Sequence, residues 1–205
     1  MSTEAGSIHN RVGDNVEELA TNILASAPPT FALAGMSLGG FVALEIVRRC
    51  PARVDRIALI STSARPDTEP ERTVREQRLE IARAGRSREL PPLHFAKNVH
   101  PSRQSDDALR ATHRTMADEV GIAGYISQQN AIGSRPDARQ HLASICCPTL
   151  VLVGDSDLIT PPSHSEELVA AIPGSRLVVV SDAGHLALLE KPESTNAALQ
   201  TWREQ

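Results

Sequence analysis

The sequence predicts an α/β fold, a mainly parallel sheet with helices on both faces and a helical insertion. Four short runs are almost wholly apolar, as strands buried on both faces are: residues 31–35, 56–60, 149–153 and 176–180. Stretches with apolar residues at helical spacing alternate with these runs, as in sheets built from parallel strands. Residues 64–144, in contrast, contain helical stretches but no convincing strand.

The helices of the core are expected next to these strands. The first should begin at a cap formed by Asp14 and end before Pro28. Residues 37–49 should form the second helix, directly after the first strand. Two more are expected in the second half, at residues 164–171 and 192–203.

The middle of the chain is rich in Arg, Pro, Asp and Gln, yet apolar residues recur through it, which favours a folded insertion over a linker. Helical stretches are expected at residues 71–84, 106–119 and 122–132. We therefore predict three parts: an N-terminal part of the core at 1–63, a helical lid at 64–145 and a C-terminal part of the core at 146–205.

Composition excludes several classes of protein. The 205 residues are 40% hydrophobic and 22% charged, with a net charge of −4, which is typical of a globular domain. The basic residues form no run, which argues against a nucleic-acid partner. No run approaches the roughly 18 to 20 apolar residues of a membrane span. With no signal peptide visible at the N-terminus, we expect a cytoplasmic protein.

The three cysteines, Cys50, Cys146 and Cys147, make a poor disulfide framework, so reduced thiols are expected. Cys147 stands just before Pro148 at the start of an apolar strand, which favours packing over a nucleophilic role.

Ser37 is the first candidate for chemistry. It is the central residue of the run Gly-Met-Ser-Leu-Gly at residues 35–39, between a predicted strand and a predicted helix. A serine in such a sharp turn is held in a strained backbone conformation with its hydroxyl exposed. Glycines on either side should let strand and helix approach closely, and the N-terminus of the helix favours a developing negative charge.

A serine nucleophile needs a base that is oriented by a third group. His185 directly follows the strand at 176–180, and Asp155 and Asp157 directly follow the strand at 149–153. The ends of parallel strands meet at one edge of the sheet, so these side chains should gather near Ser37.

Three motifs together resemble the α/β-hydrolase superfamily, in its small bacterial esterase and enol-lactonase-like branch: GMSLGG, PTLVLVGDSDLITPP and VVVSDAGHLALLEKPE. The resemblance implies a catalytic triad of Ser37, Asp157 and His185 in that family's chain order. It leaves Asp155 as a turn residue, whose carboxylate is expected to bind nearby backbone N–H groups.

The resemblance implies hydrolysis of small carboxylic esters or lactones through an acyl-enzyme on Ser37, with the Leu38 N–H in the oxyanion hole and no metal or organic cofactor. Two alternatives stay open. One is different chemistry of the same triad: acyl transfer, C–C bond hydrolysis or perhydrolysis. The other is a non-catalytic truncated remnant that binds a ligand or partner.

The chain departs from the family pattern at its start, where the strands and the oxyanion loop that should precede the first helix are absent. The strand at 31–35 should then form a sheet edge. A misassigned start, a fragment or a second copy that covers the edge (a homo-oligomer) would explain this. The 205-residue chain expressed alone is expected to be poorly soluble and weakly active.

The remaining aromatic and imidazole side chains are expected to be structural. Tyr125 and Trp202 should act as packing anchors. Six histidines lack ligand spacing and should have surface or capping roles: His9, His94, His100, His113, His141 and His164.

Overall fold

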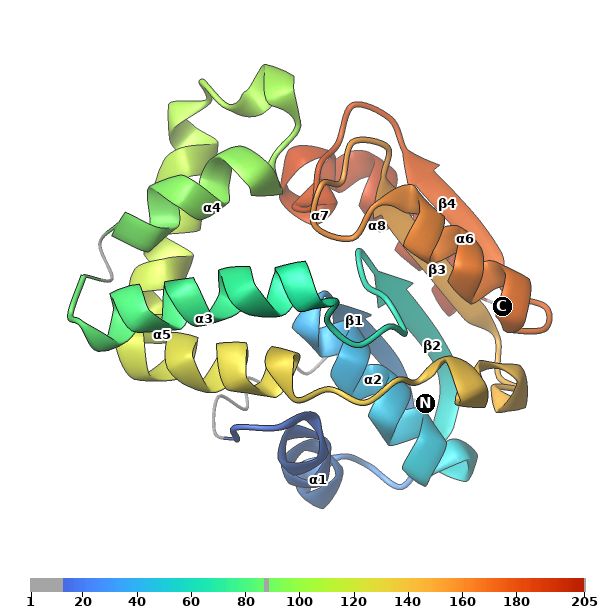
Figure 1. The fold of residues 1–205 in the computed structure, drawn as a ribbon. Helices are drawn as coiled ribbons and strands as arrows, with labels where there is room; N and C mark the ends of the chain where they lie inside the picture. The colour runs from blue at the N-terminus through green and yellow to red at the C-terminus, as the bar shows by residue number, and fades with distance from the viewer. Residues whose placement is uncertain (1–12, 87–88, 205) are drawn as a thin grey trace.

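The computed structural model describes residues 13–86 and 89–204, and these residues contain a parallel sheet of four strands (Figure 1). The strands lie in the order β1-β2-β3-β4, and each neighbouring pair is parallel. Their bounds are β1 Phe31–Met36, β2 Val54–Ile60, β3 Thr149–Gly154 and β4 Arg176–Val180. The predicted fold class and all four predicted strands are confirmed.

Helices cover both faces of the sheet, as predicted. On one face, α1 packs on α2, α2 packs on β1 and β2, and α6 packs on β3 and β4; α8 covers the other face. Their bounds are α1 Val16–Ser26, α2 Leu38–Arg49, α6 Pro162–Ala171 and α8 Pro192–Arg203. Two short helices complete this part, η1 Pro51–Arg53 and α7 Ala187–Glu190.

The side chains of the inner strands alternate between two cores. Ile57 and Leu59 of β2 point into the core that contains α1, α2 and α6. Ala58 of β2 and Leu152 of β3 point to the opposite core, beside Trp202 of α8. All five are buried, which accounts for strand sequences that are apolar on both faces. Trp202 is thus a packing residue, as predicted.

The segment between β2 and β3 is helical, and α3, α4 and α5 gather together beside the sheet (Figure 1). The bounds are α3 Glu69–Arg83, α4 Leu90–Asn98, η3 Pro101–Arg103, α5 Asp107–Gly133 and η4 Arg139–Ser144. The two helices expected at 106–119 and 122–132 form α5, which is interrupted at Gly121 by a non-helical backbone (φ 66°, ψ 177°). Helix α4 was not predicted.

The cap of α1 differs from the prediction by one residue. Asn15, rather than Asp14, is the N-cap, and its side-chain oxygen accepts a hydrogen bond of 2.8 Å from the Glu18 N–H. The Asp14 N–H donates to the Glu18 carboxylate instead, at 3.0 Å. Asn and Asp cap helices almost equally well, so composition could not distinguish the two positions.

Strand β1 lies at one edge of the sheet, as predicted, because its only partner among the described strands is β2. Ala32 and Ala34 on this strand are exposed. The edge therefore presents small apolar side chains beside backbone groups that are free to pair with another strand.

Among residues 13–86 and 89–204, none of the helices combines the length and the apolar character needed to span a bilayer.

Candidate functional site

Ser37 stands in the turn that joins β1 to α2 and has a strained backbone. Its φ of 51° and ψ of −115° are unusual for a residue with a side chain. The Ser37 N–H donates to the Ile60 carbonyl at 3.0 Å, and its carbonyl accepts from the Thr62 hydroxyl at 2.9 Å. Neighbouring β2 thus holds the turn, while Leu38 begins α2 with an N–H that has no acceptor within the helix.

Glycine is required at two places around this turn. A Cβ on Gly35 would lie 2.2 Å from the Gly39 carbonyl oxygen, and one on Gly40 would lie 2.3 Å from the Thr62 hydroxyl. A Cβ on Gly39 would meet nothing within 4 Å. The prediction of close approach is therefore correct for Gly35 and wrong for Gly39, since Gly40 makes the second tight contact.

Asp157 and His185 form a buried pair at the carboxyl ends of β3 and β4. The His185 Nδ1 lies 2.9 Å from one carboxylate oxygen of Asp157 and 3.1 Å from the other. Asp157 is 2% exposed and His185 is 5% exposed. An Nδ1–H that donates to this carboxylate leaves Nε2 as the basic nitrogen of the ring.

The carboxylate of Asp157 is held by several donors. The N–H groups of Ile159 and Thr160 each donate to it at 2.9 Å, and the Thr160 hydroxyl donates at 3.0 Å. Burial alone raises the pKa of Asp157, but the hydrogen bond and charge of His185 and these backbone donors outweigh burial and lower it below 3.8. Asp157 is therefore an anion at neutral pH.

Thr160 was not singled out from the sequence, although its position could have indicated a role. A hydroxyl three residues after an aspartate in a turn is near enough to donate to that carboxylate, which can accept several hydrogen bonds. Its oxygen also lies 3.4 Å from the His185 Nδ1, so it contacts both members of the pair.

Asp155 is a turn residue, as expected. Its carboxylate accepts from the N–H groups of Asp182 at 3.0 Å and Ala183 at 3.3 Å, and from the Ser156 hydroxyl at 3.0 Å. It therefore connects the loop after β3 to the loop that carries His185. Of the two aspartates that the sequence offered, Asp157 is the one that contacts the imidazole.

Ser37 and His185 both line a large open cavity of about 2160 Å³, together with Leu38 and Thr160. Within the described part of the chain, no hydrogen bond joins the Ser37 hydroxyl to the imidazole. Such contacts are often long before substrate binds. The site thus brings together a strained serine, an imidazole with a buried carboxylate partner and a helix N-terminus, a set suited to nucleophilic attack on a carbonyl.

Helix α4, from the segment between β2 and β3, packs beside these residues. Phe95, which is 4% exposed, packs in a cluster with Met36 and Leu186, the neighbours in sequence of Ser37 and His185. The Leu186 N–H also donates to a lid carbonyl, that of Asn98, at 2.9 Å. The helical segment between β2 and β3 therefore contacts both loops of the site.

Glu190 joins the segment between β2 and β3 to the loop of His185, and it was not predicted from the sequence. Its carboxylate is 3% exposed and accepts from the Gly184 N–H at 2.8 Å and the His100 N–H at 2.7 Å. Its carbonyl accepts from Arg103 at 3.0 Å. No sequence signal marks this role, because His100 and Arg103 lie 90 and 87 residues away along the chain and the third partner, Gly184, contributes only a backbone N–H.

The other histidines only partly match the prediction. His100 caps η3, as expected, because its ring accepts from the Ser102 N–H at 3.2 Å. His94 is neither a surface nor a capping residue: it is half-buried, lines the large cavity and lies 3.3 Å from the Tyr125 hydroxyl. His113 is half-buried as well, 3.3 Å from the side chain of Asn98. His9 lies outside the described residues.

The cysteines are free, and burial raises the pKa of the half-buried Cys147. A protonated thiol in that position agrees with a packing role.

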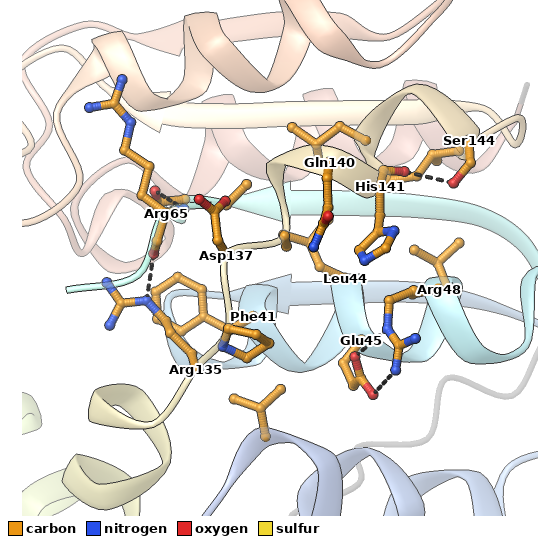
Figure 2. A pocket seen from close by; sticks show the side chains of 18 of the residues that line it. Phe41, Leu44, Glu45, Arg48, Arg65, Arg135, Asp137, Gln140, His141 and Ser144 are labelled. Atoms are coloured by element: carbon orange, nitrogen blue, oxygen red, sulfur yellow. Dashed lines mark hydrogen bonds and ion pairs between the residues drawn. The ribbon is translucent and has the colours of Figure 1, made fainter.

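A smaller cavity of about 170 Å³ lies between α2 and η4 (Figure 2). Ser37, Asp157 and His185 are not among its lining residues. Its wall includes a bidentate ion pair between Glu45 and Arg48, with both bonds at 2.8 Å. We therefore place the candidate site in the larger cavity.

Within residues 13–86 and 89–204, no three or more His, Cys, Asp and Glu side chains are grouped to hold a metal ion.

Comparison with known proteins agrees with this architecture. The model of the alpha/beta hydrolase fold family matches residues 9–192. An esterase from Thermogutta terrifontis superposes with a TM-score of 0.84 at 29% identity, over 93% of this chain and 72% of the esterase. The enol-lactonase from Burkholderia xenovorans LB400 superposes with a TM-score of 0.85 at 25% identity, over 94% of this chain and 75% of the enzyme.

A curated relative, "Putative non-heme bromoperoxidase BpoC" of Mycobacterium tuberculosis, is 28% identical over 181 residues. That alignment covers 82% of this chain and 65% of the relative, so the chain spans less than two thirds of its length. "Putative carbamate hydrolase RutD" of Escherichia coli O150:H5 is 29% identical over 189 residues, which cover 89% of this chain and 69% of the relative. On the family match and these structural neighbours, the chain belongs to the alpha/beta hydrolase fold family.

Proposed function

We propose that the protein is a serine hydrolase of small carboxylic esters or lactones that acts through an acyl-enzyme on Ser37. The observation that carries this proposal is the buried pair of His185 and Asp157, whose imidazole lines the same cavity as a serine in a strained strand-to-helix turn. Similarity to an esterase and an enol-lactonase supports the substrate class.

In the proposed first step, the Ser37 oxygen attacks the substrate carbonyl while its proton moves to the His185 Nε2. Asp157 keeps the Nδ1 proton in place and stabilises the imidazolium. The negative oxygen of the tetrahedral intermediate accepts a hydrogen bond from the Leu38 N–H. Collapse of the intermediate breaks the ester bond, and His185 returns its proton to the departing alcohol.

In the second step, water attacks the acyl group on Ser37 and gives its proton to His185. The second intermediate collapses to release the carboxylic acid and restores the serine hydroxyl. Asp157 remains an anion throughout, because its donors hold its pKa below 3.8.

Trapping of the acyl-enzyme tests this proposal. The folded protein is mixed with p-nitrophenyl acetate, quenched in acid and analysed by peptide mass spectrometry. We expect an acetyl group on Ser37 and none in the Ser37→Ala variant. Ser127→Ala is the matched control: Ser127 lines the same cavity, but its hydroxyl donates to the Gly13 carbonyl at 2.7 Å. This variant should still be acetylated on Ser37.

Folded protein with an unmodified Ser37 would contradict the proposal and favour a non-catalytic protein that binds a ligand or partner. Perhydrolysis is a second candidate, because a relative is named as a bromoperoxidase. In that reaction, hydrogen peroxide replaces water, attacks the acyl group on Ser37 and leaves as a peracid. Bromination of monochlorodimedone in the presence of acetate, bromide and hydrogen peroxide would reveal it.

A further inference from the structure

Helix α3 of the lid places an arginine without a partner in the large cavity. Five arginines from the segment between β2 and β3 line this cavity: Arg75, Arg78, Arg110, Arg114 and Arg135. Four of them pair with acidic side chains, whereas Arg78 has no hydrogen bond or ion pair to any described residue. It is nevertheless half-buried, so part of its side chain packs on the protein while it lines the cavity.

The acidic side chains of the cavity are already engaged. Asp67 is 6% exposed and binds Arg75 and Arg135, each at 2.6 Å. Glu71 accepts from the Thr68 N–H at 2.7 Å, Asp118 lies 3.9 Å from Arg114, and Glu119 also interacts with another residue. The charge of Arg78 is therefore available to a ligand.

Two uncharged polar groups lie within the electrostatic range of Arg78. Tyr125 and His94 both line the cavity, and both feel the charge of Arg78. Burial, followed by the positive charges of Arg78, His113, Lys97 and Arg75, lowers the pKa of His94 to about 4. Burial raises the pKa of Tyr125 despite the opposing effect of Arg78 and Arg75. At neutral pH neither group supplies an anion for the guanidinium.

Helix α4 connects this region to the candidate site. Phe95, which follows His94 in α4, packs against the residues next to Ser37 and His185. Arg78, His94, Ser37 and His185 line one continuous cavity. A ligand with its carbonyl at Ser37 can therefore extend toward α3.

We propose that Arg78 binds a carboxylate on the substrate, so that the preferred substrates are esters or lactones that carry a second, ionised carboxyl group. This inference rests on the proposed function for the ester part of the substrate. A guanidinium is suited to the role because its parallel N–H groups match the two oxygens of a carboxylate. Tyr125 and His94 supply further polar contacts at the edge of this subsite.

A binding measurement tests the inference without requiring turnover. In a Ser37→Ala background, dissociation constants are measured by ligand-observed NMR for the monomethyl esters of succinate, glutarate and adipate and for their neutral dimethyl esters. We expect at least one monomethyl ester to bind about tenfold more tightly than its dimethyl counterpart. Arg78→Gln should remove this preference and leave the affinity for the dimethyl ester within about twofold.

Two further variants separate the charge of Arg78 from a general effect on α3. Arg78→Lys should restore part of the preference. Arg83→Gln should keep all of it, because Arg83 is 53% exposed on the same helix and is not among the residues that line the cavity. Three results would each overturn the inference: monomethyl esters that bind no more tightly than the dimethyl esters, monomethyl esters that show no detectable binding, or tighter binding of the monomethyl esters that persists in Arg78→Gln. Binding of the monoanion through Arg78 without acetylation of Ser37 would instead contradict the proposed function alone.

Discussion

The imidazole of His185 donates to the carboxylate of Asp157 at 2.9 Å, although 28 residues separate them in the chain. The two parallel strands β3 and β4 bring them together, because the carboxyl ends of both strands lie at the same edge of the sheet. The same edge carries Ser37 at the end of β1.

Asp157→Asn should slow fluorophosphonate labelling of Ser37 by about 10³- to 10⁴-fold. The asparagine amide can donate its own N–H to Nδ1, which favours the tautomer with the proton on Nε2 and leaves that nitrogen without its basic lone pair. Labelling rates followed by intact-protein mass spectrometry measure the effect. Asp155→Asn is the control, since that carboxylate binds backbone N–H groups and not the imidazole. If the two variants lowered the labelling rate equally, the role of Asp157 as the acid of the triad would be refuted.

His94 should make the folded state less stable in mild acid. Its pKa is about 4 in the folded protein and near 6.5 when unfolded. Between these two values the unfolded chain binds a proton that the folded protein excludes. The free energy of unfolding should therefore decrease as the pH falls from 6.5 to 4, by about 2 kcal/mol.

Urea unfolding at pH 7 and at pH 4.5 measures this effect. His94→Gln should reduce the pH dependence, whereas Tyr125→Phe, which keeps the imidazole, should retain it. The same pH dependence in wild type and His94→Gln would show that other groups cause it.

Glu190→Gln should lower the free energy of unfolding by about 1 to 3 kcal/mol. The carboxylate accepts from the N–H groups of Gly184 and His100, and a glutamine would direct its own amide hydrogens at one of them. Labelling of Ser37 should also slow, because Gly184 precedes His185. Glu193→Gln on the exposed side of α8 is the control for both measurements. Unchanged stability in Glu190→Gln would contradict the role of Glu190 between lid and loop.

The edge of β1 should promote self-association of the chain expressed alone. Ala34→Lys places a charge among exposed apolar residues on that edge, which disfavours edge-to-edge pairing. Analytical ultracentrifugation should show a smaller average mass for this variant than for wild type. Val74→Lys, at another exposed apolar residue, should have no such effect. A wild-type chain that is already soluble and monomeric would contradict the prediction.

The strands were predictable from sequence because both of their faces are buried, which leaves uninterrupted apolar runs such as Leu150–Val153. Because β3 and β4 were expected to be parallel, their carboxyl ends, and with them Asp157 and His185, were expected at one edge of the sheet. Helix α4 was missed because Pro91 and Pro92 resemble a break, although proline is accepted in the first turn of a helix. The interruption of α5 at Gly121 was visible as a gap between two helical stretches.

Side chains whose role depends on packing between distant segments could not be predicted. His94 was expected at the surface, yet it lies half-buried beside Tyr125, 31 residues away in the chain. Glu190 reads as a surface charge in sequence, but α7 turns it inward against two backbone N–H groups. In both cases the local sequence is compatible with an exposed residue. Only the tertiary structure determines that the side chain is buried or half-buried.

Fluorophosphonate labelling tests the central claim most directly, because it reports whether Ser37, His185 and Asp157 act together. The folded protein is incubated with the probe at neutral pH, and the modified residue is located by peptide mass spectrometry. We predict a single modification on Ser37 that is lost in Ser37→Ala and strongly slowed in His185→Gln and Asp157→Asn. An unlabelled Ser37 in folded protein, or labelling that does not depend on His185, would contradict the account.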